Sequence, residues 1–197
     1  MNVEPVTLEA EYVRLEPLSR EEHLRALQEA GASSSIFEWF ADDYSTPEAM
    51  ETFVEAALDA QEEGESLPFA TVHREAGEAI GSTRFCTIRP ENRSVEIGWT
   101  WLTPDHQRTP ANTEAKYLML RHAFEEWSCA RVEFETAAGN DRSRAALTRI
   151  GATLEGTLRK HMLVQGEPTD SAYFSVIDEE WPEVRRSLEA ELDRPTP

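Results

Sequence analysis

The segment from Val95 to Trp127 constrains the fold more than any other part of the chain. Its first part, VEIGWTWL, is rich in β-branched and aromatic residues and predicts a strand. A polar loop, TPDHQRTPAN, follows, and TEAKYLMLRHAFEEW then has the spacing of an amphipathic helix. A helix that starts directly after a strand and a short loop has unpaired backbone N–H groups at its first turn. Such a helix start attracts anions, and phosphates above all.

Length and charge limit the classes of protein that fit. We expect the 197 residues to form one domain, 1–197, with a core of ordinary size. The net charge of −19 argues against a nucleic-acid partner, because a polyanion would be repelled by most of the surface. No apolar run has the length of a signal peptide or a membrane span, so we expect a cytoplasmic protein without a membrane partner. The two cysteines, Cys86 and Cys129, lie in apolar surroundings and are interpreted as inert thiols.

The order of the predicted elements indicates a mixed α/β protein with one mixed sheet and helices on both of its faces. Ser19, Thr46 and Asn140 each precede a helical pattern and are predicted N-caps. The predicted strands span residues 12–18, 69–73, 79–88, 95–102, 132–136, 154–164 and 172–177. The predicted helices span residues 20–30, 47–63, 113–127, 141–150 and 178–192.

Four segments, in this order, resemble the GNAT superfamily of acetyltransferases: EIGWTW, QRTPANTEAK, NDRSRAALTRIGA and DSAYFSVIDEEWP. The resemblance is closest to the RimJ/RimL-like branch, which includes the ribosomal-protein N-terminal acetyltransferases. It implies a GNAT-like domain with a central, mixed, mostly antiparallel twisted sheet of about seven strands. It also implies acetyl-CoA as co-substrate, a primary amine as acceptor (a small molecule or a peptide N-terminus) and no metal. Relatives often form dimers, so a homodimer is compatible with the resemblance.

The family's Q/R-x-x-G-x-G/A loop, which wraps the pyrophosphate of coenzyme A, corresponds to residues 107–112 here. Both glycine positions are substituted, by Pro110 and Asn112. Asparagine visits left-handed conformations more readily than most residues, whereas proline has no N–H to offer to a phosphate. The alternative interpretation is an ordinary strand-to-helix loop. The residues expected to hold the cofactor here are Gln107, Arg108, Thr109, Pro110, Ala111, Asn112 and Thr113.

The resemblance also assigns roles to residues near this loop. Glu96 is at the position of the base that accepts the proton of the amine, and Ser143 is at that of a hydroxyl that returns a proton to the thiolate. Asn140 is at the position that holds the pantetheine arm, although its capping role alone explains an asparagine there. The alternative for Glu96 is a solvated strand face. The alternative for Ser143 is that the proton returns through water or from a tyrosine, Tyr117 or Tyr173. The backbone expected to pair with the pantetheine amides belongs to Trp101, Leu102 and Thr103.

Local charge offers two further hypotheses. Residues 140–161 contain five basic side chains and two acidic ones, which favours an anionic ligand or, alternatively, an exposed arginine-rich surface. Residues 42–65 contain nine acidic side chains and no Lys or Arg, which would attract a cationic amine or form a solvated helix face. The aromatic residues Trp39 and Tyr44 are candidates for substrate binding, with core packing as the alternative. The five histidines have no metal-ligand spacing.

Two functions are compatible with these patterns. The favoured one is an acyl-CoA-dependent N-acetyltransferase that works by direct attack of the amine. The alternative is a non-catalytic acyl-CoA-binding or regulatory protein, which the proline in a degenerate pyrophosphate loop would favour.

Overall fold

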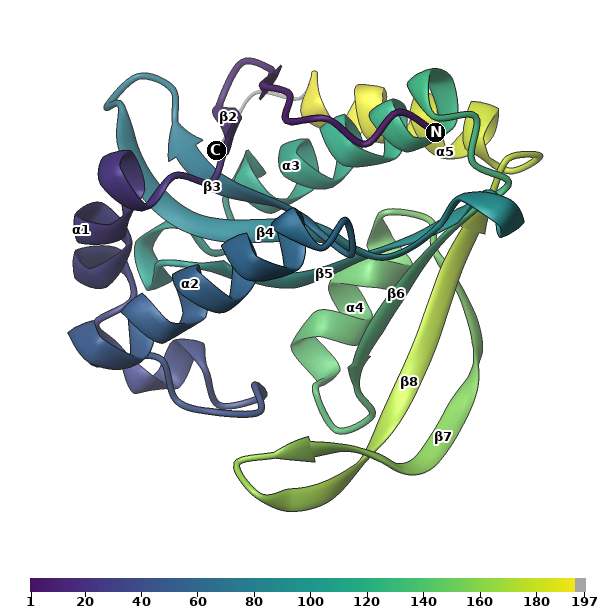
Figure 1. Ribbon diagram of the computed structural model, residues 1–197. Coiled ribbons are helices and arrows are strands. Elements are labelled where there is room, and N and C mark those ends of the chain that lie inside the picture. Colours follow the sequence, from purple (N-terminus) through teal and green to yellow (C-terminus); the bar gives the residue numbers. More distant parts are fainter. Residues whose placement is uncertain (194–197) are drawn as a thin grey trace.

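The computed structural model describes residues 1–193, in which eight strands form one open sheet in the order β1-β2-β3-β4-β5-β6-β8-β7 (Figure 1). The strands are β1 (Leu8–Glu9), β2 (Val13–Pro17), β3 (Leu67–His73), β4 (Glu78–Arg89), β5 (Ser94–Leu102), β6 (Arg131–Ala137), β7 (Thr153–Val164) and β8 (Glu167–Ile177). The helices are α1 (Arg20–Ala30), α2 (Pro47–Glu62), α3 (Pro110–Arg121), α4 (Asp141–Arg149) and α5 (Trp181–Leu192).

The sheet is mixed and mostly antiparallel, as predicted. Strands β5 and β6 are parallel, and the other neighbouring pairs are antiparallel. The prediction of about seven strands omitted β1. This strand has only two residues, Leu8 and Glu9, which are too few for an alternation of apolar and polar side chains to be recognised.

Helices cover both faces of the sheet. Helices α1 and α2 pack on one face, where Leu27, Phe53 and Trp101 belong to a common apolar cluster. Helices α3, α4 and α5 pack on the other face around a larger cluster that includes Leu118 and Leu147. In Figure 1, α1 and α2 lie at the left of the sheet, whereas α3 and α5 lie along its upper edge. No helix within residues 1–193 combines the length and the hydropathy needed to cross a membrane.

The three predicted N-caps are confirmed. The hydroxyl of Ser19 accepts the N–H of Glu22, and the hydroxyl of Thr46 accepts that of Ala49. The side chain of Asn140 accepts the N–H of Ser143 at 3.0 Å. These starts were predictable because a cap needs only a short polar side chain and its own local turn.

The predicted start of α3 was wrong. The helix begins at Pro110 and not at Thr113, because Thr109 caps it and proline takes the first helical position, where its fixed φ and missing N–H cost least. It also ends earlier, at Arg121, and continues as a π-helical turn, His122–Glu126.

The β7–β8 hairpin is longer than predicted. Strand β8 begins at Glu167, not at residue 172, and pairs with β7 out to the turn. At the turn, Gln165 and Gly166 have positive φ values of 48° and 84°, as a two-residue hairpin loop requires. The N–H of Gln165 donates to the carbonyl of Ala41 at 2.8 Å. The hairpin tip is therefore fastened to the connection between α1 and α2.

Strands β5 and β6 diverge in the middle of the sheet. They pair only between Ser94–Glu96 and Arg131–Glu133, after which β5 continues with β4 and β6 continues with β8 (Figure 1). A bulge adds to the divergence, because β5 places Trp99 and Thr100 opposite a single residue of β4, Thr83. Trp99 has a φ of 53° and faces α2, whereas Thr100 faces α3.

The carboxylate of Glu114 in α3 generates a prediction about stability. It is 4% exposed and accepts the N–H groups of Glu11, Tyr12 and Val13 at 3.1, 2.8 and 2.6 Å. Glu114→Ala should lower the free energy of unfolding by about 3 kcal/mol or more, because three donors lose their acceptor. Urea denaturation measures this loss. The exposed Glu126→Ala is the control, expected within about 0.5 kcal/mol of the wild type. Equal effects of the two substitutions would contradict the role of Glu114.

Candidate active site

The loop between β5 and α3 is held in place by its own side chains. The amide of Gln107 donates to the carbonyl of Leu102 at 3.0 Å, and the hydroxyl of Thr109 donates to the carbonyl of His106 at 2.7 Å. Among the described residues, the backbone N–H groups of Arg108, Thr109 and Asn112 have no hydrogen-bond partner. Three unpaired donors at the start of a helix have the chemistry that an anion site requires.

The loop residue with the left-handed conformation is Arg108 and not Asn112. Arg108 has a φ of 64°, whereas Asn112 lies inside α3 with Pro110 and Ala111. The proline is the first residue of the helix, and the N–H of Ala111 is used by the Thr109 hydroxyl at 3.3 Å. Pro110 and Asn112, which replace the two glycines of the family's loop, are thus accommodated because α3 already begins at Pro110.

The start of α4 lies beside this loop. The guanidinium of Arg142 donates to the side-chain oxygen of Gln107 at 2.8 Å, which links the two helix starts. The half-buried hydroxyl of Ser143 is on the first turn of α4, and it makes no hydrogen bond within the described part of the chain. Trp39, from the α1–α2 connection, packs against Gly139, where an added Cβ would lie 3.1 Å from the indole ring.

Beyond Glu96 the edge of β5 is unpaired and borders the gap between β5 and β6. Part of the backbone predicted to bind pantetheine already forms hydrogen bonds within the protein. The carbonyl of Leu102 accepts the Gln107 amide, and the N–H of Thr103 donates to the carbonyl of Ile80 at 2.8 Å. The side chain of Trp101 is buried under α2. A pantetheine arm bound like an added strand would therefore pair with the backbone groups of β5 between Glu96 and Leu102.

Glu96 is the last residue of β5 that pairs with β6, so its carboxyl group lies where the strands begin to separate. It accepts a hydrogen bond from the hydroxyl of Thr87 at 2.9 Å. Burial raises the pKa of Glu96, and the nearby carboxylates of Glu135 and Glu133 raise it further. An added Cβ on Gly98 would lie 3.1 Å from Glu96 Oε1, so the glycine leaves room for the carboxyl group.

Glu135 on β6 was not identified from the sequence. Its carboxylate accepts hydrogen bonds from Ser171 at 2.6 Å and from Tyr173 at 2.9 Å, and it lies 3.0 Å from His161 Nδ1. Alternation along VEFET places Glu133 and Glu135 on one face, but the alternation alone does not indicate that this face borders the gap. Burial and the bond to Glu135 raise the pKa of Tyr173, so its phenol stays protonated.

The two candidate tyrosines lie in different places. Tyr173 belongs to the hydrogen-bonded group around Glu135, on the same sheet face as Glu96 and Glu133. Tyr117 donates its hydroxyl proton to Glu189 of α5 at 2.8 Å, on the side of the sheet that α3 and α5 cover.

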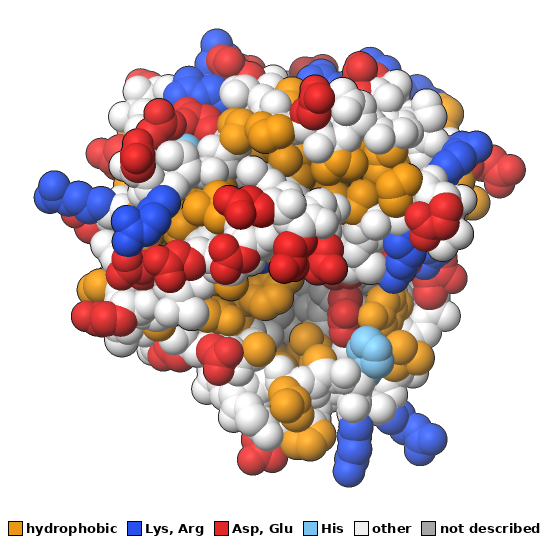
Figure 2. Space-filling view, in the orientation of Figure 1, with side chains coloured by type: hydrophobic (Ala, Val, Ile, Leu, Met, Phe, Trp, Pro, Cys, Tyr) orange, Lys and Arg blue, Asp and Glu red, His pale blue; other side chains and the backbone are white. Residues whose placement is uncertain are grey.

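Aromatic rings from the α1–α2 connection, α2 and β5 lie on the same face of the sheet as Glu96. Tyr44 lies 5.6 Å from Phe37 and 5.1 Å from Phe53, and the ring of Trp99 lies 6.0 Å from Phe53, measured between centroids. Arg84 of β4 places its guanidinium carbon 4.4 Å from the Trp99 ring centroid. Figure 2 shows this face of the molecule hollowed near its centre, with hydrophobic side chains and a carboxylate at the rim.

The predicted charge clusters are only partly directed toward the site. In the basic segment, Arg149 pairs with Glu191 of α5, away from the loop, whereas Arg142 reaches Gln107. In the acidic segment, Glu51 and Glu55 pair with Arg20 of α1. The remaining acidic side chains of α2 are exposed on its outer face, as the solvated-helix alternative describes.

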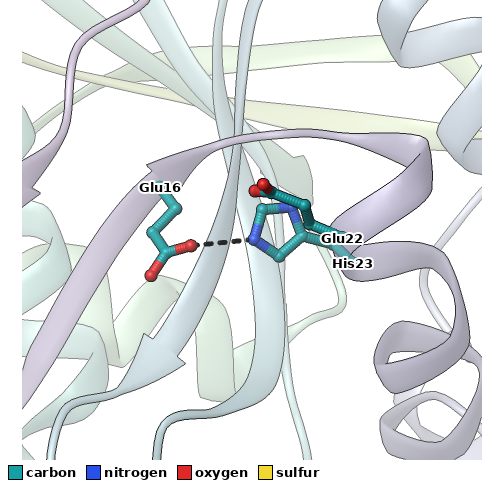
Figure 3. Close-up of side chains that lie close together, drawn as sticks. All are labelled: Glu16, Glu22 and His23. Carbon is teal, nitrogen blue, oxygen red and sulfur yellow. Dashed lines mark hydrogen bonds and ion pairs between the residues drawn. The ribbon is translucent and has the colours of Figure 1, made fainter.

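A cluster of Glu16, Glu22 and His23 has the composition of a metal site (Figure 3). Its hydrogen bonds instead fasten the start of α1 to β2. His23 Nδ1 accepts the N–H of Ser19 at 3.0 Å, which leaves the proton on Nε2, 3.0 Å from Glu16. Both ring nitrogens are therefore occupied, and the imidazole has no lone pair left for a cation.

Lys116 of α3 was also not identified from the sequence. Its side chain is buried, and Nζ donates to the hydroxyl of Thr100 at 2.5 Å and lies 5.9 Å from the centroid of the Phe134 ring. It therefore spans the gap between β5 and β6 on the α3 side. Burial lowers the pKa of Lys116 to about 7.

Comparisons with known proteins identify a family model and several similar proteins. Residues 13–153 match the family model described as an acetyltransferase (GNAT) domain. A GCN5-related N-acetyltransferase from Brucella melitensis is 33% identical, with a TM-score of 0.89 over 95% of this chain and 85% of that chain. YdaF of Bacillus subtilis, named as a candidate ribosomal N-acetyltransferase, is 33% identical over 53% of this chain and 57% of its own length. RimJ of Mycobacterium smegmatis, solved in complex with CoA-disulfide, shares the fold at 22% identity, with a TM-score of 0.81 over 95% of each chain.

The burial of Lys116 predicts a pH dependence of stability. Its pKa falls from 10.5 in the unfolded chain to about 7 in the folded protein, so folding releases a proton between these values. The free energy of unfolding of the wild type, minus that of Lys116→Met, should rise from pH 7 to pH 10 by up to about 1.4 kcal/mol per pH unit. Urea denaturation of both proteins at four pH values measures the slope. A difference that stays constant over this range would show that Lys116 keeps an ordinary pKa.

Proposed function

The chain belongs to the GNAT acetyltransferase family and is therefore an acyl-CoA-dependent N-acetyltransferase, and from this premise we propose that it acetylates a primary amine by direct attack, with Glu96 as base. The observation that carries the proposal is the place of Glu96. Its carboxyl group lies where β5 and β6 separate, and burial raises its pKa toward the range useful for proton transfer near neutral pH.

The donor would bind across the gap. The unpaired N–H groups of Arg108, Thr109 and Asn112 suit a pyrophosphate, and the Arg108 guanidinium can add a charge-assisted bond. The free edge of β5 suits the amides of the pantetheine arm, which would pair with it as a short added strand. This arrangement directs the acetyl end of the donor toward Glu96.

The reaction needs a neutral amine, because an ammonium group has no lone pair with which to attack. Glu96 accepts a proton from the amine, whose nitrogen forms a bond to the thioester carbonyl carbon. The carbon–sulfur bond breaks, and the thiolate takes up a proton. Ser143, on the first turn of α4, is the proposed source of that proton, with water as the ultimate donor because a serine hydroxyl is itself a weak acid.

The acceptor is a small molecule or a peptide N-terminus that enters from the hollowed face. Trp39 and Tyr44 lie on the α1–α2 connection, whose Ala41 carbonyl binds the hairpin tip at Gln165. We propose that the aromatic residues and the hairpin, which this contact joins, border the entrance and restrict the size of the acceptor. A cytoplasmic location and a homodimer stay predictions.

The regulatory alternative rests on Pro110, which supplies no N–H to a phosphate. Its position at the start of α3 weakens that argument, because three other amides around it are unpaired within residues 1–193. Donor binding without turnover across a panel of amines would nevertheless support the alternative.

Removal of the base should mainly affect the chemical step. Glu96→Gln should lower kcat by about 10²- to 10⁴-fold with little change in affinity for acetyl-CoA. In the wild type kcat/KM should fall as the pH drops below the raised pKa of Glu96, and the variant should lack this acidic limb. Thiol release followed from pH 5 to pH 9 measures both. Full activity of the variant with the same limb would exclude Glu96 as the base.

A donor added at Pro110 should tighten cofactor binding. Pro110→Ala restores one N–H at the first helical position, and one more hydrogen bond to phosphate should improve the Kd for acetyl-CoA by about 3- to 10-fold. Isothermal titration measures the change. Pro104→Ala adds an N–H outside the start of α3 and should leave the Kd unaltered. If the two variants bind alike, the start of α3 does not hold the pyrophosphate.

A further inference from the structure

Arg84 is a buried cation in a pocket of aromatic rings. It is 5% exposed, and its guanidinium carbon lies 4.4 Å from the centroid of the Trp99 ring and 4.9 Å from that of Phe53. Strand register places it opposite Gly98 of β5, on the same face of the sheet as Cys86 and Glu96. The guanidinium therefore belongs to the wall of the region in which the acceptor is proposed to bind.

No carboxylate in the described part of the chain compensates this charge. Within residues 1–193, Arg84 takes part in no ion pair and no side-chain hydrogen bond, and its Nε is fully buried without a partner. The acidic groups that interact with it most are Cys86 and Tyr44. Burial raises the pKa of both, so both are neutral at pH 7.

An unpaired buried cation is costly. Burial lowers the pKa of Arg84 to about 10, but the group stays charged at neutral pH. Buried charges in proteins are nearly always paired, and the stacked rings of Trp99 and Phe53 offset only part of the desolvation. A bound anion would supply the missing partner, and guanidinium binds carboxylates with two parallel hydrogen bonds.

We propose that Arg84 binds a carboxylate of the acceptor, so that the substrates are amines that carry a carboxylate a few bonds from the nitrogen. The proposal rests on the function given above and names its substrate class. Arg84 and Glu96 are diagonal neighbours across β4 and β5, which places their Cα atoms about 7–8 Å apart. One small acceptor can therefore present its amine to Glu96 and its carboxylate to Arg84.

Two sources offer this chemistry. A free amino acid has a main-chain carboxylate beside the amine, whereas a peptide that begins with aspartate or glutamate has a side-chain carboxylate. Both would meet a surface of net charge −19, so the cation must lie inside the site in order to select them. Its aromatic walls strengthen the attraction by keeping water away.

The test compares matched acceptors. Thiol release from acetyl-CoA is measured with Asp-Ala-Ala amide and Asn-Ala-Ala amide, and with alanine and alaninamide, for the wild type and for Arg84→Gln. The wild type should prefer the carboxylate member of at least one pair by about 10- to 100-fold in kcat/KM, the effect of a charge-assisted bond. The pair that shows the preference identifies the source. Arg84→Gln should lose the preference.

Controls separate the role of Arg84 from the acetyltransferase function. Arg25→Gln removes one positive charge from the exposed face of α1 and should retain the preference. If the wild type acetylates neutral and acidic acceptors alike, or if Arg84→Gln keeps the preference, the inference is wrong while the acetyltransferase function stands. If no acceptor releases thiol, the proposed function fails. Thermal shifts by the same compounds then decide: a carboxylate-dependent rise in Tm that Arg84→Gln abolishes supports the Arg84 site, and its absence overturns it.

Folding is checked independently. Removal of an unpaired buried charge should not destabilise the protein, so Arg84→Met should have a Tm equal to or above that of the wild type. A marked fall in Tm would show that Arg84 is a structural residue with its partners already in place, and it would overturn the proposal.

Discussion

The separation of β5 from β6 is the constraint on which the rest of the site depends. Three paired residues hold the two strands together, and beyond Glu96 each strand continues with another neighbour. The bulge at Trp99 turns the backbone of β5 and brings two aromatic side chains to the α2 face. An interrupted sheet leaves backbone groups unpaired, which a fold tolerates where a ligand can satisfy them.

The side chains around this gap are those that a stable core would avoid. Glu96, Lys116 and Arg84 are all held in low-dielectric surroundings, which shift their pKa values toward the neutral forms. None of them forms an ion pair within the part of the chain that the structure describes. Their costs must be offset by the two apolar clusters on either side of the sheet. Such concentration of unfavourable charge is typical of sites where binding and proton transfer take place.

The sequence predicted the features that depend on local chemistry. The caps at Ser19, Thr46 and Asn140 follow from one short side chain and its own turn, and the order of strands and helices follows from periodicity. The start of α3 was placed three residues late, although Thr109-Pro110 repeats the pattern of Thr46-Pro47 that was correctly interpreted. There the capping hydroxyl and the proline decide where the helix starts.

The residues that were missed depend on tertiary structure. Arg84 in GSTRFC resembles any polar residue of a half-exposed strand, and its burial follows from the bulge and from α2 above it. Glu135 acquires its partners only because β8 continues past Ser171 and the hairpin brings His161 alongside. Lys116 looks like a solvated helix residue until the gap between the strands is known. Strand register across the sheet, which one sequence does not reveal, decides all three.

The proposed chemistry requires that the donor occupy the gap between β5 and β6, and a crystal structure with bound acetyl-CoA tests this most directly. The pyrophosphate should accept hydrogen bonds from the N–H groups of Arg108, Thr109 and Asn112, and the thioester should lie beside β5 within reach of Glu96. A donor bound elsewhere, with the edge of β5 between Glu96 and Leu102 unoccupied, would contradict the proposed site.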